Sequence, residues 1–485
     1  MLTESSPRSR RGRRVEGTVL PRLVGQDLEV QLADGATRSY VNLDMAASTP
    51  AMEAVADAVI EFLPWYSSVH RGAGFASQVS TRAYEAAREA VATFVGARST
   101  DAVIFVRNTT EAINLLTHCL VLRPGHSVLS TIVEHHANML PWRRLAPVHL
   151  LDAPDSPEQL LADLRRALED RHRPIGVIAM TGASNVTGEV FPIAEIGRLA
   201  HEHGALLSVD AAQLAPHRAI DMVAMGIDFL SLSGHKMYAP FGGGVLVAPS
   251  AVLRDAEPML AGGGAVTYVT ADDVQWASLP DRHEAGSPNV VGAIALGAAC
   301  TALGSTGMAH IGAHERRLLA YLDGHIDELP SLHRLRLWQG PDIDRLGVST
   351  FTVDGMHHAL VASILSAEYG VGVRHGCFCA HPYITHLLGV GIGEAHTIRE
   401  RLRRGEHQEI PGAIRASFGI GTSLEHIDRL IAALREITTY GPHLEYAENP
   451  QTGDYLPVDD RRTLPAFDFL PPLEAMATPS GCGQF

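Results

Sequence analysis

The segment DFLSLSGHKMYAPFGGGVLVA, residues 228–248, carries the clearest fold signal in the chain. Two short apolar runs, 228–231 and 243–248, are predicted strands joined by a loop short enough to make the second strand antiparallel to the first, at the far side of the sheet. Lys236 lies in this loop and is the one lysine among 39 basic residues, so the other 38 are arginine. An amine condenses with carbonyl groups and a guanidinium does not, so Lys236 is a candidate catalytic residue. Chance retention of a single lysine is the alternative.

Similar apolar runs recur upstream, each ending in a polar cluster and each followed by a helix-like segment. Their alternation indicates an α/β protein with a mainly parallel sheet. The expected strands, besides the two above, cover residues 102–107, 127–132, 176–180 and 205–209.

We expect four regions along the chain. A second α/β stretch begins near Arg345, and the sequence after Gly441 lacks periodicity. The predicted division is an N-terminal tail with lead-in strands (1–39), a large domain (40–300), a smaller C-terminal domain (301–440) and an extended tail (441–485).

Composition restricts the class of protein. With 46% hydrophobic residues, the chain has enough apolar surface for a large buried core. A net charge of −15 argues against nucleic acid as a partner, and no apolar run is long enough to predict a membrane span. Five cysteines are too few for a disulfide scaffold, which favours a cytoplasmic location. Five arginines within residues 5–14 indicate either a transit-type segment or a disordered tail.

Polar residues at the carboxyl ends of parallel strands meet at one edge of the sheet, where ligands bind. Asp210 ends a strand 26 residues before Lys236, and its carboxylate suits a pyridinium nitrogen; a strand-end cap is the alternative. His135 and His136 follow another strand, where an imidazole can lie flat on an aromatic ring. A metal pair is disfavoured because adjacent side chains of an extended chain point in opposite directions.

The segment 107–111 joins a strand to a helix. Thr109 and Thr110 therefore bring hydroxyl groups and backbone amides to a helix N-terminus, which is a natural anion site. A phosphate would bind there, and Ser233 and His235, from the end of the neighbouring strand, are placed to reach it. An ordinary capping box that includes Glu111 is the alternative.

Taken in order, the motifs carry a family resemblance. They occupy residues 40–44, 69–72, 107–111, 134–138, 184–188, 209–213, 233–236, 284–289 and 415–417. The set resembles the pyridoxal-phosphate (PLP) enzymes of aminotransferase class V, and most of all the branch of cysteine desulfurases and selenocysteine lyases. The resemblance implies a fold-type I PLP-dependent transferase, with a mainly parallel seven-stranded sheet in the large domain and a smaller α/β C-terminal lobe.

The resemblance also implies residue roles. Lys236 would hold PLP covalently, His135 would stack on its ring, and Asp210 would meet the pyridine nitrogen. Family members are homodimers with the active site at the interface. The remaining implied roles are binding of the phosphate (Thr109, Thr110, Ser233 and His235), contact with the ring hydroxyl and its surroundings (Gln213 and Asn185), a contribution from the partner subunit (Ser287) and substrate binding (Arg415 for the carboxylate, with Arg374 and Asn185).

By the same resemblance, Cys379 is the nucleophile and Arg374 anchors its loop. A thiolate at Cys379 would attack the substrate sulfur, giving alanine and a persulfide. The loop departs from the nearest desulfurases at Cys377 and Phe378, where Gly-Cys-Phe-Cys resembles the molybdenum-cofactor sulfurases. Cys377 is interpreted as a buried apolar residue, as a second relay thiol or, least favoured, as part of a Cys-x-Cys metal site; no metal site is predicted.

Two further segments have open interpretations. The 35 residues between Cys379 and Arg415 include an arginine-rich run, 399–404, and form a longer link than in compact desulfurases. This insertion is either a solvated charged helix or an element that remodels substrate access. Cys482, near the C-terminus, is either an inert tail cysteine or a mobile thiol acceptor.

The predicted function is therefore a PLP-dependent cysteine desulfurase. It would convert L-cysteine to L-alanine, with a persulfide on Cys379 for transfer to a sulfur-acceptor protein. The alternative is a class V aminotransferase, epimerase or carbon–sulfur lyase without a persulfide, which would require activity to survive Cys379→Ser. A cofactor-binding scaffold with little turnover is disfavoured by the presence of Lys236, Asp210 and Arg415 together.

Overall fold

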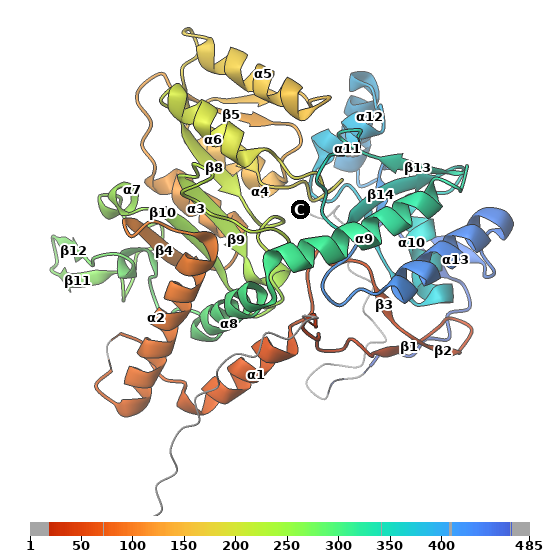
Figure 1. The fold of residues 1–485 in the computed structure, drawn as a ribbon, viewed down its shortest axis with the longest axis horizontal. Helices are drawn as coiled ribbons and strands as arrows, with labels where there is room; N and C mark the ends of the chain where they lie inside the picture. The colour runs from red at the N-terminus through yellow and green to blue at the C-terminus, as the bar shows by residue number, and fades with distance from the viewer. Residues whose placement is uncertain (1–18, 71, 341, 407–409, 466, 468–485) are drawn as a thin grey trace, which may run out of the picture.

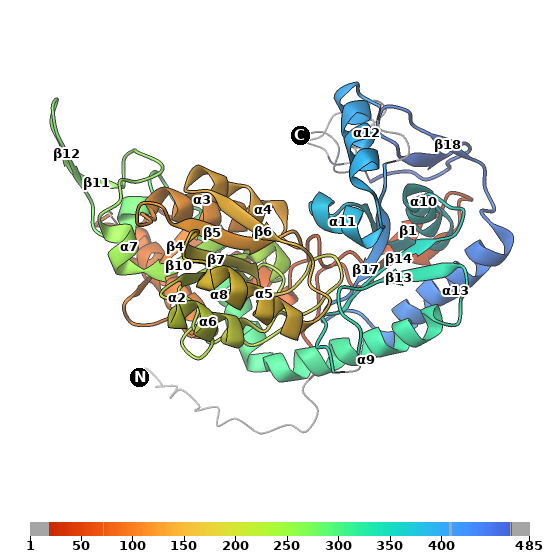
Figure 2. The same ribbon diagram turned by 90° about the horizontal axis from the view of Figure 1, so that it is seen from above.

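The computed structural model describes residues 19–70, 72–340, 342–406, 410–465 and 467. The arginine-rich segment 5–14 and Cys482 lie outside the described residues. The chain forms a large lobe around one sheet and a smaller lobe around another, and helix α9 (Met308–Ile326) runs along both (Figures 1 and 2).

The large lobe is built on a seven-stranded sheet with the order β4-β10-β9-β8-β7-β5-β6. Its strands are β4 (Asp101–Val106), β5 (Ser127–Thr131), β6 (Val148–Leu151), β7 (Ile175–Thr181), β8 (Leu206–Asp210), β9 (Phe229–Ser233) and β10 (Gly244–Pro249). All neighbours from β9 to β6 are parallel, and β10 is antiparallel to both β9 and β4. The predicted α/β fold and the antiparallel strand are confirmed.

Two details of this sheet differ from the prediction. The antiparallel strand β10 was expected at the far side of the sheet, but β4 lies outside it. Edge strand β6 was not predicted, because its four half-buried residues lack the continuous apolar run of the central strands.

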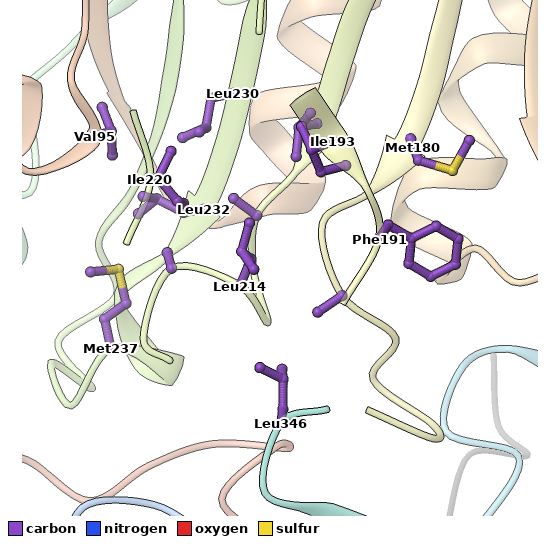
Figure 3. Packing of buried hydrophobic residues seen from close by; sticks show 14 of the residues in the cluster. Val95, Met180, Phe191, Ile193, Leu214, Ile220, Leu230, Leu232, Met237 and Leu346 are labelled. Atoms are coloured by element: carbon purple, nitrogen blue, oxygen red, sulfur yellow. The ribbon is translucent and has the colours of Figure 1, made fainter. Parts of the chain in front are cut away.

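Successive side chains along each strand point to opposite faces of the sheet, and both faces are apolar. On one face, Ile104, Val177 and Phe229 pack with α3 (Thr109–Cys119). On the other, Leu230 and Leu232 join the largest core cluster of the described residues; Figure 3 shows part of its packing. The helices α1 (Glu53–Phe62), α2 (Phe75–Val95), α5 (Pro157–Glu169), α6 (Ile193–Glu202) and α8 (Val290–Thr306) contribute to this second cluster.

The small lobe contains a four-stranded antiparallel sheet with the order β13-β14-β17-β16. Its elements include β13 (Leu332–Leu335), β14 (Val348–Val353), α10 (His358–Tyr369), β16 (Arg374–Gly376), β17 (Ala413–Ser417) and α13 (Leu424–Tyr440). A separate core cluster fills the space between this sheet and helices α9, α10 and α13. Strand β3 (Val41–Asn42) pairs with β15 (Val371–Gly372), which ties the N-terminal part of the chain to this lobe.

The link between Cys379 and Arg415 forms α11 (His381–Leu387) and α12 (Ile392–Arg403). None of the described side chains of α12 is buried, as expected for a solvated charged helix. After Gly441, in the segment predicted as a tail, β18 (Tyr446–Glu448) and β19 (Tyr455–Pro457) form a hairpin, and β19 packs against α10.

Among the described residues, no single helix has the length and composition of a membrane span. Helices α8 and α9 meet that criterion only when taken together, and a bend of 77° separates them. The described part of the chain also contains no group of three or more His, Cys, Asp or Glu side chains arranged to hold a metal ion.

Candidate functional site

A cavity of about 200 Å³ lies where the carboxyl ends of the large-lobe strands face the small lobe. It brings together nearly all of the residues singled out in the sequence. Those that line it are Thr109, Thr110, His135, Asn185, Asp210, Gln213, Ser233, His235, Lys236, Arg374, Cys379 and Arg415.

The N-terminus of α3 forms one end of the cavity. Asn108 caps this helix, since its side chain accepts a hydrogen bond of 3.0 Å from the Glu111 amide. The Thr109 amide and hydroxyl each lie 2.8 Å from the Ser233 hydroxyl, which joins the helix to the end of β9. The cap is therefore an asparagine and not the Ser/Thr capping box considered from the sequence. Thr109 and Thr110 place backbone dipoles and hydroxyl groups where an anion would bind.

Lys236 follows β9 in a short 3-10 turn, Gly234–Lys236, and faces the cavity. Burial lowers the pKa of its amine to about 8, and the Asp210 carboxylate opposes this effect only in part. Near neutral pH a much larger fraction of this amine is uncharged than in an ordinary lysine. It is therefore suited to nucleophilic attack on an aldehyde.

Asp210 and Gln213 extend from the end of β8. The Ala212 amide donates a 2.9 Å hydrogen bond to Asp210 Oδ1. Burial raises the pKa of Asp210, while that hydrogen bond and the Lys236 charge act against the increase. Gln213 Nε2 donates to the Ala46 carbonyl at 2.7 Å, but its Oε1 atom is buried without a hydrogen-bond partner among the described residues. The cavity thus contains an acceptor suited to a donor on a ligand.

The structure distinguishes the two adjacent histidines, which the sequence left open. His135 lines the cavity and caps α4 (His136–Met139), with Nδ1 accepting a 3.1 Å hydrogen bond from the Ala137 amide. His136 instead stacks on His381, with ring centroids 5.1 Å apart and planes within 3°. His135 is the histidine available to a ring in the cavity.

A buried hydrogen-bond network that sequence reasoning missed supports the His135 segment. Glu134 accepts hydrogen bonds from Asn138 Nδ2 at 2.7 Å and from the Thr181 amide at 2.8 Å. Asn138 in turn accepts from the Trp142 indole at 3.0 Å. The network anchors this segment to β7. The sequence feature that could have indicated this network is the pair Glu134 and Asn138, two polar residues four positions apart within one motif.

Arg415, from β17, is buried and lines the cavity. It donates to the Asn185 carbonyl at 2.8 Å and to Asp44 at 3.1 Å, and its guanidinium lies 4.8 Å from the centre of the Phe378 ring. Burial lowers the pKa of Arg415, and the Asp44 carboxylate counteracts that effect. Asp44 also lies 3.8 Å from Arg374. Sequence reasoning gave Asp44 no role, although it ends the motif at 40–44.

The turn that presents Cys379 has an unusual backbone. The Ala380 amide donates to the Cys377 carbonyl at 2.9 Å, and the two central residues, Phe378 and Cys379, both have φ of 54°. Left-handed backbone costs a non-glycine residue about 1–3 kcal/mol, so the surroundings must hold this turn. Asn185 Nδ2 donates to the Phe378 carbonyl at 2.8 Å, and the His136 amide to the Cys379 carbonyl at 2.9 Å. The large lobe therefore holds the Cys379 turn of the small lobe at the cavity.

Ser287 is the one predicted site residue that does not line this cavity. It lines a separate hollow of about 360 Å³ together with residues 66–70, Gly264 and Gly286. Within a single chain, the structure does not bring Ser287 to Lys236, which is compatible with its expected role across a subunit interface.

Comparison with known proteins identifies the family of this chain. The family model for aminotransferase class-V matches residues 41–430. A cysteine desulfurase of Dickeya dadantii is 38% identical over 417 residues, covering 84% of this chain and 93% of that protein. A cysteine desulfurase of Haloferax volcanii is 33% identical over 432 residues, covering 87% and 95%.

Solved structures agree with the sequence relatives. The apo cysteine desulfurase of Thermococcus onnurineus superposes with a TM-score of 0.72 at 30% identity, covering 82% of this chain and 94% of that chain. A cysteine desulfurase of Escherichia coli gives a TM-score of 0.69 at 31% identity, with the same coverage. The chain therefore belongs to the aminotransferase class-V family of PLP-dependent enzymes and, within it, to the cysteine desulfurases.

Proposed function

We propose that this enzyme converts L-cysteine to L-alanine and retains the sulfur as a persulfide on Cys379. The observation that carries the proposal is that the Cys379 thiol lines the same cavity as Lys236, Asp210 and Arg415. An aminotransferase needs the last three groups but has no use for a thiol on a strained turn aimed at its substrate. Cysteine desulfurases as sequence and structural relatives support the same assignment.

The residues of the cavity fit PLP. The Lys236 amine, which loses its proton more readily than an ordinary lysine, suits the aldehyde; the α3 N-terminus suits the phosphate, and the buried Gln213 Oε1 atom provides an acceptor for the ring hydroxyl. Asp210 would meet the pyridine nitrogen, and His135 would cover one face of the ring. When bound, PLP supplies an electron sink for the carbon atoms of the substrate. The phosphate site comprises Thr109, Thr110, Ser233 and His235.

Arg415 is the proposed site for the substrate carboxylate. Its terminal nitrogens contact the Asn185 carbonyl and Asp44, which fix the plane of the guanidinium. Its Nε atom is buried and has no hydrogen-bond partner among the described residues. A carboxylate would satisfy this donor and gain a charge-assisted hydrogen bond. Arg374 adds a second cation at the same side of the cavity.

Cys379 performs the sulfur transfer. Its thiolate attacks the sulfur of bound L-cysteine, so that a sulfur–sulfur bond forms and the carbon–sulfur bond of the substrate breaks. The electron pair of the broken bond stays with the substrate carbon, which takes a proton and leaves as L-alanine. The left-handed backbone at Phe378 and Cys379 fixes the thiol toward the substrate before the reaction.

We further propose a cytoplasmic homodimer that passes its persulfide sulfur to an acceptor protein. Ser287 of the partner subunit would complete the phosphate site, which gives a role to a residue that lies apart from the cavity within one chain. Sedimentation of the Ser287→Ala variant beside the wild type, with cofactor retention measured after dialysis, tests this arrangement. A dimer with weakened cofactor retention is expected, whereas a monomeric, fully active wild type would exclude it.

The decisive experiment mixes the PLP-loaded protein with L-cysteine and follows cofactor absorbance, alanine release and persulfide labelling. We expect alanine and a labelled Cys379, both lost in Cys379→Ser. Cys482→Ser, at a position outside the described residues, is the matched thiol control and should behave as wild type. Alanine formation that survives Cys379→Ser, or a spectral change without persulfide, would instead favour a lyase, epimerase or aminotransferase.

A further inference from the structure

A second thiol lies two residues before Cys379, on the side of the turn that does not face the cavity. Cys377 is buried, with 6% of its surface exposed, and is not among the cavity-lining residues. Its Sγ atom lies 3.1 Å from Nε2 of His381. Such a contact allows the imidazole to take the thiol proton, which is how histidines activate cysteine nucleophiles.

The imidazole of His381 is also linked to the backbone turn that carries Cys379. Its Nδ1 atom lies 3.3 Å from Nε2 of His136, and the two rings are stacked. The backbone amide of His136 donates to the Cys379 carbonyl. His381 is exposed, so a proton taken from Cys377 can pass to solvent. Cys377 therefore has a base and a route for its proton that do not use the substrate cavity.

On the basis of the function proposed above, we propose that Cys377 is a second sulfur carrier, which takes the persulfide sulfur from Cys379. The Cys377 thiolate, its proton transferred to His381, attacks the terminal sulfur of the Cys379 persulfide. A sulfur–sulfur bond forms on Cys377, and the bond between that sulfur and Cys379 Sγ breaks. Cys379 recovers its thiolate, so the step needs no oxidant or reductant.

The turn geometry supports this transfer. The hydrogen bond from the Ala380 amide to the Cys377 carbonyl closes a tight four-residue turn in which Cys377 is the first residue and Cys379 the third. Cys377 and Cys379 are both members of this turn, one outside the cavity and one inside it. Transfer to Cys377 would clear the cavity for a second substrate molecule while the first sulfur awaits an acceptor.

A count of alanine per chain tests the proposal. The PLP-loaded enzyme is mixed with excess L-cysteine, without any other reductant or acceptor. In the first phase, before L-cysteine itself removes persulfide sulfur, each sulfur-holding thiol allows one turnover. We expect a burst of two alanine molecules per chain for wild type and for Cys482→Ser, one for Cys377→Ser and none for Cys379→Ser. A wild-type burst of one would overturn the relay, as would a burst that falls to one in Cys482→Ser.

Peptide mapping gives a second test, and its wild-type arm does not depend on the folding of any variant. Chymotryptic cleavage after Phe378 separates Cys377 and Cys379 onto different fragments. The extra sulfur should appear first with Cys379 and then with Cys377, and the second stage should slow at least tenfold in His381→Gln. Sulfur found only with Cys379, or a disulfide between the two residues with release of sulfide, would overturn the relay. Alanine formation by Cys379→Ser would instead overturn the proposed function itself.

Discussion

The single lysine makes the acidity of its amine directly measurable. Burial lowers the pKa of Lys236 to about 8 from an ordinary value of 10.5. At pH 7, the uncharged fraction is then about 10 to the power 2.5, or about 300 times, that of an ordinary lysine. Only the uncharged amine reacts with an aldehyde or an arylating reagent, so this factor appears in the rate of reaction.

The assay is arylation of the apoprotein across pH 6 to 11 with an amine-specific reagent such as a trinitrobenzenesulfonate. Peptide mapping separates the product at Lys236 from that at the N-terminal amine, since the chain has no other lysine. The rate at Lys236 should rise with pH and level off above a midpoint near 8. A midpoint at or above 10 would refute the reasoning that burial in this cavity governs the amine.

Asp210→Asn provides a directional test. The Asp210 carboxylate stabilises the charged amine and partly offsets burial, so its removal should move the Lys236 midpoint below that of wild type. Asp272→Asn, at an exposed turn between β11 (Val266–Val269) and β12 (Val274–Trp276), is the matched control and should leave the midpoint unchanged. An upward shift in Asp210→Asn would contradict the assigned electrostatics.

Three further predictions concern binding and stability. Arg415→Lys loses the hydrogen bond to the Asn185 carbonyl and the planar fork, so kcat/KM for L-cysteine should fall by about tenfold to a hundredfold, mainly through KM; an unchanged KM would contradict the carboxylate role. Asn108→Ala removes the cap of α3 and should lower the free energy of unfolding by about 1 kcal/mol in urea titrations, with no change counting against it. Arg345→Met removes one of three arginines that contact the Asp323 carboxylate, while Arg334 and Arg336 remain at 2.7 and 2.8 Å; the same method should give a loss of about 1–3 kcal/mol, and a loss above about 5 kcal/mol would contradict this sharing of the charge.

The sequence by itself determined the fold class and most of the cavity. Apolar strands carry their own pattern, and polar residues at the ends of parallel strands must meet at one edge of the sheet. Asp210 ends one such strand, and Thr109 and Lys236 each lie three residues after another, so their convergence in one cavity was predictable before any tertiary contact was known. The unusual composition singled out Lys236 independently.

Only the tertiary structure decided the contacts that orient these groups. Asp44 and Arg415 are 371 positions apart, and their ion pair exists because the segment that follows β3 pairs with β17 at Ser417. The left-handed backbone at Phe378 and Cys379 contradicts local preference and persists because Asn185 and His136, from the large lobe, hold its carbonyl groups. The local sequence pattern encodes which residues end a strand. Hydrogen bonds between distant elements depend instead on how the cores pack, and this packing decided which of the two thiols faces the cavity.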